Sequence, residues 1–102
     1  MNFNKYQEKA MSFRLPSATP TYAMLGLIGE LGELYGPMAK AIRDSSTVNL
    51  RDLEKELGDV LWFITAIADD LGLYLDQIAS TNIDKLTDRK ARDVIKGSGD
   101  DR

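Results

Sequence analysis

Two stretches of this 102-residue sequence decide the fold: GLIGELGELYG, from Gly26 to Gly36, and EKELGDVLWF, from Glu54 to Phe63. In both stretches, leucine, isoleucine and valine recur at the three- and four-residue spacing of an amphipathic helix. Each stretch nevertheless carries two acidic residues three positions apart inside or beside its apolar run. The pattern predicts two apolar helices that bring charge into the surface where helices pack.

Apolar residues at helical spacing, interrupted by helix-stopping residues, predict four helices. Their expected ranges are about residues 4–14, 21–43, 50–71 and 75–92. Pro16 and Pro20 break the chain after the first helix. Thr21 and Asn49 are the predicted N-caps of the second and third helices. No segment shows the two-residue alternation of a β-strand, so we expect an all-α, four-helix bundle-like fold.

The length of the chain fits one domain. We expect residues 1–94 to form a single helical domain, and residues 95–102, IKGSGDDR, to form a flexible polar tail because they are rich in glycine and charge. A domain this small buries a modest fraction of its surface, so its wide apolar helix faces gain by packing against a second copy. We therefore expect oligomerisation to complete the bundle.

The composition restricts the possible functions. A net charge of −3 and a pI near 4.8 argue against a nucleic-acid-binding protein, which normally presents a basic patch to phosphates. With no histidine and no cysteine, a metal must be held by oxygen ligands, which favour Mg²⁺ or Mn²⁺. No run approaches the roughly 18 apolar residues of a membrane span, and the first residues lack the apolar region of a secretory signal. We expect a cytoplasmic protein that binds neither nucleic acid nor membrane.

The two acidic pairs are the strongest candidates for a functional site. Positions three apart on a helix share a face, so Glu30 is expected beside Glu33 on the second helix. Glu56 is likewise expected beside Asp59 on the third. Either pair alone is more often an exposed, salt-bridging stripe. Two pairs within the most apolar segments favour a metal site, because carboxylates that converge at a helix contact repel one another without a cation.

These motifs resemble a known family. Glu30-x-x-Glu33, then 22 residues, then Glu56-x-x-Asp59 is similar to the signature of the MazG-like nucleotide pyrophosphohydrolases, which belong to the all-α nucleoside triphosphate pyrophosphatase superfamily. The likeness extends to GLIGELGEL, ELGDVLWF and NIDKLTDR, and so covers most of the chain, from about Tyr22 to Arg89. This chain resembles a short, single-domain member.

The resemblance implies a function and a site. Family members use Mg²⁺ to hydrolyse nucleoside triphosphates, often deoxy or non-standard ones, to the monophosphate and pyrophosphate, a nucleotide-pool house-cleaning reaction. It implies that all four acidic residues bind the metal, with Mn²⁺ as a possible substitute. It also implies homodimers, or tetramers built from dimers, in which neighbouring subunits complete each site. One carboxylate must take the proton of the attacking water, and Glu33 is our candidate.

Residues near the end of the chain are candidates for phosphate contact. Asn82, Lys85 and Arg89 follow one another at helical spacing and match the family's pattern of an asparagine and a lysine that touch the phosphates. Their alternative interpretation is a solvated helix face, and basic residues are favoured near a helix C-terminus in any case.

Aromatic residues are candidates for contact with the base, although aromatics at helical spacing more often belong to a core. Phe63 is the best candidate because it lies one turn after Asp59 and therefore near the carboxylates. Tyr6 and Gln7 of the first helix are expected to close the nucleotide pocket.

Two other interpretations remain open. In the first, the chain is a helical dimerisation or interaction module whose carboxylates only form salt bridges between subunits. In the second, the same fold and metal act on a different substrate, such as phosphoribosyl-ATP, because a fold does not determine a substrate.

Overall fold

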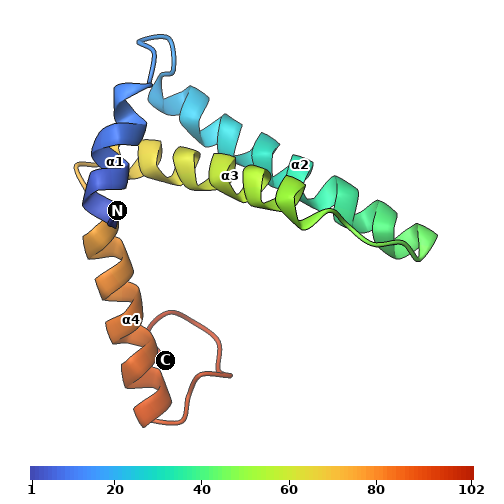
Figure 1. Cartoon of the computed structure of the whole chain (residues 1–102). Helices are drawn as coiled ribbons and strands as arrows, with labels where there is room; N and C mark the ends of the chain where they lie inside the picture. The colour runs from blue at the N-terminus through green and yellow to red at the C-terminus, as the bar shows by residue number, and fades with distance from the viewer.

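Four helices make up the protein, whose computed structural model describes residues 1–102 (Figure 1). They are α1 (Phe3–Ser12), α2 (Pro20–Asp44), α3 (Leu50–Asp70) and α4 (Leu75–Ala91). There is no strand, so the predicted all-α class is confirmed. None of the four helices combines the length and the apolar character that a membrane crossing requires.

Short polar side chains cap the N-termini of three of the helices. The Asn2 side chain accepts a hydrogen bond from the N–H of Lys5 at 2.9 Å and caps α1. Asn49 caps α3 as predicted. The predicted cap of α2 at Thr21 is wrong, because Thr19 is the N-cap and Pro20 fills the first helical position. Proline suits that position, where its missing N–H has no helical partner to lose.

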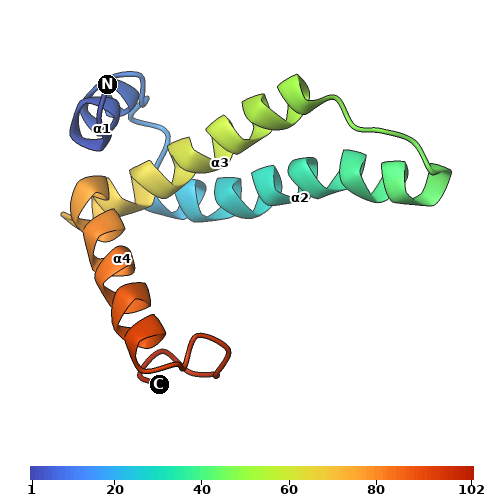
Figure 2. The same cartoon turned by 60° about the horizontal axis from the view of Figure 1, so that its bottom comes forward.

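The contact between α2 and α3 forms the core. Ala23, Phe63 and Ala66 are its buried centre, and Trp62 packs edge-on against Phe63 with ring centroids 5.2 Å apart. Gly26 on α2 makes this packing possible. A Cβ atom at residue 26 would lie 2.2 Å from Cε1 of Phe63, far inside van der Waals contact. The two helices therefore lie side by side as an antiparallel hairpin (Figures 1 and 2).

Three polar contacts fasten α1 to α3 and to the turn between α3 and α4. The indole N–H of Trp62 donates to the carbonyl of Ala10 at 3.0 Å. The Gln7 amide donates to the carbonyl of Leu73 at 3.0 Å and accepts from the N–H of Leu75 at 2.8 Å. Gln7 is buried, so its role here is structural, in contrast to its predicted place at the edge of a nucleotide pocket.

Arg14 closes the remaining loop against α3. Its guanidinium forms two hydrogen bonds with the carboxylate of Asp70, at 2.9 and 3.0 Å, and a third at 2.9 Å with the carbonyl of Ala18. Such a bidentate pair fixes direction as well as distance. It positions the segment that leads into α2.

The last helix leaves the rest of the chain. Figures 1 and 2 both show α4 running away from the α2–α3 hairpin, with the tail segment (residues 95–102) folded back beside the end of α4. The radius of gyration is 16.6 Å, against about 13 Å for a compact domain of 100 residues. A single chain thus supplies the four helices of the predicted bundle without closing them around one core.

The Gly26–Phe63 contact generates a prediction about stability. Gly26→Ala should destabilise the protein by about 1–3 kcal/mol, because the added methyl overpacks a buried aromatic ring. Gly29→Ala is the matched control on the same helix. A Cβ at residue 29 meets nothing within 4 Å, so the substitution should be stabilising by about 0.5–1 kcal/mol through helix propensity. Urea denaturation of both variants measures the difference, and equal effects would contradict the proposed close packing.

Candidate metal centre and its surroundings

Three carboxylates converge where α2 packs against α3. Glu30 and Glu33 come from α2, Glu56 comes from α3, and one carboxylate oxygen of each lies within 4.8 Å of the others. The packing of Gly26 against Phe63 sets this register, since Glu30 lies one turn beyond Gly26 and Glu56 two turns before Phe63. The predicted meeting of the two helices' acidic residues is thus present in a single chain.

The electrostatics of this cluster are unfavourable without a cation. One oxygen of Glu30 and one of Glu56 are buried and have no hydrogen-bond partner. The pKa of Glu30 is raised, first by burial and then by the negative charges of Glu33 and Asp59 and by the adjoining carboxyl of Glu56. Burying polar oxygens without partners costs free energy. The chain carries this cost at one place between its two longest helices.

The fourth predicted ligand lies at the edge of the cluster. The charge of Asp59 contributes to the raised pKa of Glu30, which places it nearby. Its carboxylate is exposed and lies outside the group of three oxygens within 4.8 Å. Its role as a ligand stays a prediction.

The residues of the cluster fit a hard divalent cation. They offer only carboxylate oxygens, the donors that Mg²⁺ and Mn²⁺ prefer, and two of those oxygens are buried without a partner. Mg²⁺ commonly uses a few carboxylates and fills its other positions with water and substrate phosphate. Glu33 is the exposed member of the three, so it faces the side that solvent can reach.

Phe63 lies in the core between the helices. Its ring packs against Gly26, Trp62 and Tyr22 and is 9% exposed. The spacing from Asp59 indicated a side chain near the carboxylates, but spacing along one helix does not reveal which neighbour covers it. The structure gives Phe63 a packing role, and its contact with a base stays a prediction.

The predicted phosphate contacts lie on α4, away from the carboxylates. Asn82 and Lys85 line a hollow of about 410 Å³ on this helix. Arg89 is buried beneath the tail segment, with its side chain 6% exposed. Because α4 diverges from the α2–α3 hairpin (Figure 1), one chain does not bring these residues to its own carboxylate cluster.

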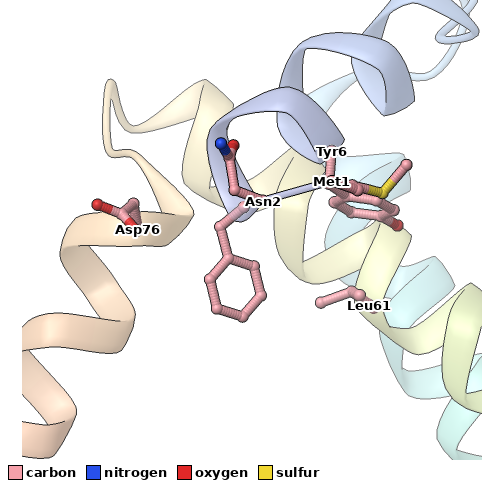
Figure 3. Close-up of a pocket in the computed structure, with 6 residues that line it drawn as sticks. Met1, Asn2, Tyr6, Leu61 and Asp76 are labelled. Carbon is pink, nitrogen blue, oxygen red and sulfur yellow. The ribbon is translucent and has the colours of Figure 1, made fainter.

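An apolar hollow of about 450 Å³ opens between α1, α3 and the start of α4 (Figure 3). Tyr6 and Leu61 line its inner side and Asp76 stands across from them. The pKa of the Tyr6 phenol is raised mainly by burial, and the charge of Asp59 raises it further. Leu61, on the wall of the hollow, lies two residues after Asp59 on α3. Tyr6 is the one lining residue that we predicted to face a nucleotide pocket; Leu61 and Asp76 come from helices distant along the chain.

The raised pKa of Glu30 generates a prediction about pH. The folded protein binds the Glu30 proton at higher pH than the unfolded chain does, so metal-free stability is lost as pH rises from the ordinary pKa of a glutamate through the raised value. Glu30→Gln removes this loss and should raise metal-free stability at pH 7, with the gain disappearing in acid. Mg²⁺ at a hundred times its Kd for the wild type should stabilise the wild type by about 2.7 kcal/mol and should not stabilise Glu30→Gln.

Thermal unfolding at several pH values, with and without Mg²⁺, checks this result. Glu54→Gln is the control, because Glu54 is an exposed glutamate of α3 outside the cluster. If Glu30→Gln and Glu54→Gln behave alike at every pH, the cluster does not carry the repulsion we infer.

Comparison with known proteins identifies a family for the segment that carries the acidic cluster. Residues 18–93, which contain the whole acidic cluster, match the model of the MazG nucleotide pyrophosphohydrolase domain. The chain is also similar to the Gene 37 protein of Mycobacterium phage L5, with 42% identity over 86 residues that span 80% of this chain and 75% of that relative. No solved structure matches it. The chain belongs to the MazG nucleotide pyrophosphohydrolase domain family.

Proposed function

We propose that this protein hydrolyses nucleoside triphosphates, including deoxynucleotides, to the monophosphate and pyrophosphate with Mg²⁺ or Mn²⁺, and so removes unwanted nucleotides from the pool. The observation that carries the proposal is the cluster of Glu30, Glu33 and Glu56, in which two buried oxygens have no partner. The match to a pyrophosphohydrolase domain supports the type of bond that is cleaved.

The carboxylates have separate roles in this proposal. Glu30 and Glu56 would hold the cation with their buried oxygens, and Asp59 and Glu33 would complete the ligand set from the exposed side. When bound, Mg²⁺ neutralises phosphate oxygens and lowers the pKa of a water molecule. Glu33 is the proposed general base, because it is the exposed one of the three converging carboxylates and so can reach a water proton from the solvent side.

A second copy of the chain is proposed to complete the site. Only eleven of 102 residues are buried, and α2 exposes large apolar side chains, among them Leu25 at 64%, Ile28 at 67% and Ile42 at 82%. Contiguous apolar surface on a small protein normally marks an interface. A dimer, or a tetramer built from dimers, would cover this surface and bring Asn82, Lys85 and Arg89 of one copy to the carboxylates of another.

The apolar hollow beside Tyr6 is the proposed place for the base. Its aromatic and aliphatic lining suits a flat, partly apolar ring, and Leu61 on its wall lies two residues after Asp59 on α3. Asp76 at its rim offers an acceptor for an amino group.

The first test of the function is the identity of the products. With Mg²⁺, a deoxynucleoside triphosphate should yield its monophosphate and pyrophosphate, as resolved by ion-exchange chromatography and a pyrophosphate assay. A panel that includes phosphoribosyl-ATP would reveal a different substrate. Release of orthophosphate and the diphosphate would place the attack at the terminal phosphorus and contradict the proposal.

Glu56→Gln should lower turnover by about a hundredfold, because it removes one cation ligand. Glu54→Gln, two residues away on α3 and outside the cluster, should retain wild-type turnover. Initial rates at saturating Mg²⁺ measure both. Equal turnover in the two variants would favour the non-catalytic interaction module instead.

A complementation experiment tests the shared site. Glu56→Gln and Lys85→Ala should each be nearly inactive alone. If the two variants are unfolded and refolded together, half of the dimers contain one chain of each. Each mixed dimer then has one site with the intact carboxylates of the Lys85→Ala chain and the intact basic residues of the Glu56→Gln chain. About a quarter of wild-type activity should return. No recovery, with mixed dimers verified by mass spectrometry, would mean that each site is built from one chain.

A further inference from the structure

The tail segment lies on Lys85 and Arg89, the basic pair that the proposed function assigns to phosphate binding. One carboxylate oxygen of Asp100 accepts hydrogen bonds from Nζ of Lys85 at 2.8 Å and from Nη2 of Arg89 at 3.1 Å. The Arg89 guanidinium also donates to the backbone carbonyl of Asp100. The position of Asp100 matches that of an anion bound between two basic residues one turn apart.

The tail holds its own shape in this position. The guanidinium of Arg102 donates to the carbonyls of Val94, Ile95 and Gly99, at 3.0, 2.9 and 2.6 Å. Gly99 has a φ of +84°, a conformation that glycine adopts without strain. A Cβ at Gly97 would lie 2.6 Å from Cδ of Arg102. These contacts close a loop that presents Asp100 to α4.

The basic pair has donor capacity that this carboxylate does not use. The Arg89 side chain is 6% exposed, and its Nε is buried without a hydrogen-bond partner. A guanidinium offers five N–H donors in a planar fork. A phosphate group, with more oxygens and more negative charge than one carboxylate, can satisfy more of these donors.

The exposure of Asp100 makes the contact exchangeable. Its side chain is 80% exposed while it pairs with Lys85, and ion pairs open to water are weak. A polyphosphate can therefore displace it. Asp101, the next residue, is also a negatively charged and exposed aspartate, but it makes no side-chain hydrogen bond or ion pair. Contact with Lys85 and Arg89 is therefore specific to Asp100.

We propose that Asp100 is an internal competitor for phosphate, which covers Lys85 and Arg89 in the free protein and leaves them when a polyphosphate binds. The proposal rests on the proposed function, because it takes these two residues as phosphate contacts. The consequence is that the tail weakens the binding of phosphate ligands and uncovers the basic pair only in their presence.

The test compares Asp100→Asn with its matched control Asp101→Asn, using inorganic pyrophosphate as the probe in calorimetric titrations of the full chain with Mg²⁺. Both variants lose one negative charge from the same segment. Asp100→Asn should bind pyrophosphate about two- to fivefold more tightly than the wild type, while Asp101→Asn should match the wild type. Equal affinities in all three proteins, or weaker binding by Asp100→Asn, would overturn the proposal.

Nuclear magnetic resonance supplies a second readout. Saturating pyrophosphate should shift the amide signals of Gly97 and Gly99 in the wild type, because Asp100 leaves α4, and Asp100→Asn should show the same shifts without ligand. Unmoved signals would overturn the proposal. Lys85→Ala separates the failure of the phosphate contact from the failure of the competition by Asp100. If it binds pyrophosphate as tightly as the wild type, the phosphate contact itself fails. If it binds more weakly while Asp100→Asn equals the wild type, only the competition fails.

Discussion

The close contact between the backbone of α2 at Gly26 and the ring of Phe63 is the constraint on which the rest of the structure depends. Small residues at Ala23 and Ala66 extend the same close contact. Dispersion and apolar burial along this line hold the two helices together. They also bring Glu30 and the acidic residues of α3 to a place that isolated carboxylates would avoid. The stability of the helix pair thus maintains the repulsion that a cation would relieve.

Local signals in the sequence predicted the helices well. The structure has α3 at Leu50–Asp70 and α4 at Leu75–Ala91, each within a residue of the range expected from periodicity and caps. The acidic residues that share a helix face were predicted for the same reason, because helical spacing is a local property. The start of α2 differed because two threonines flank Pro20, and proline prefers the first helical position over the second.

Features that depend on distant neighbours could not be predicted in this way. Spacing placed Phe63 near the carboxylates, but only the absence of a side chain at Gly26 explains why the ring turns into the core. The flexibility predicted for the tail from its glycines stays a prediction, but the hydrogen bonds of Arg102 and the contact of Asp100 with α4 could not be read from composition. The divergence of α4 likewise follows from tertiary packing, which periodicity does not encode.

Pro37 gives α2 an uneven stiffness along its length. Proline has no N–H, so the helical hydrogen bond that residue 37 would donate to the carbonyl of Glu33 is missing. Helices bend at such positions, and their amide hydrogens exchange with solvent sooner than those of a continuous core helix. The half of α2 that packs on Phe63 keeps its helical hydrogen bonds, whereas the next turn after Glu33 lacks one. The turn from Glu33 to Pro37 is therefore where α2 can bend at the least cost in hydrogen bonds, away from the packing at Gly26.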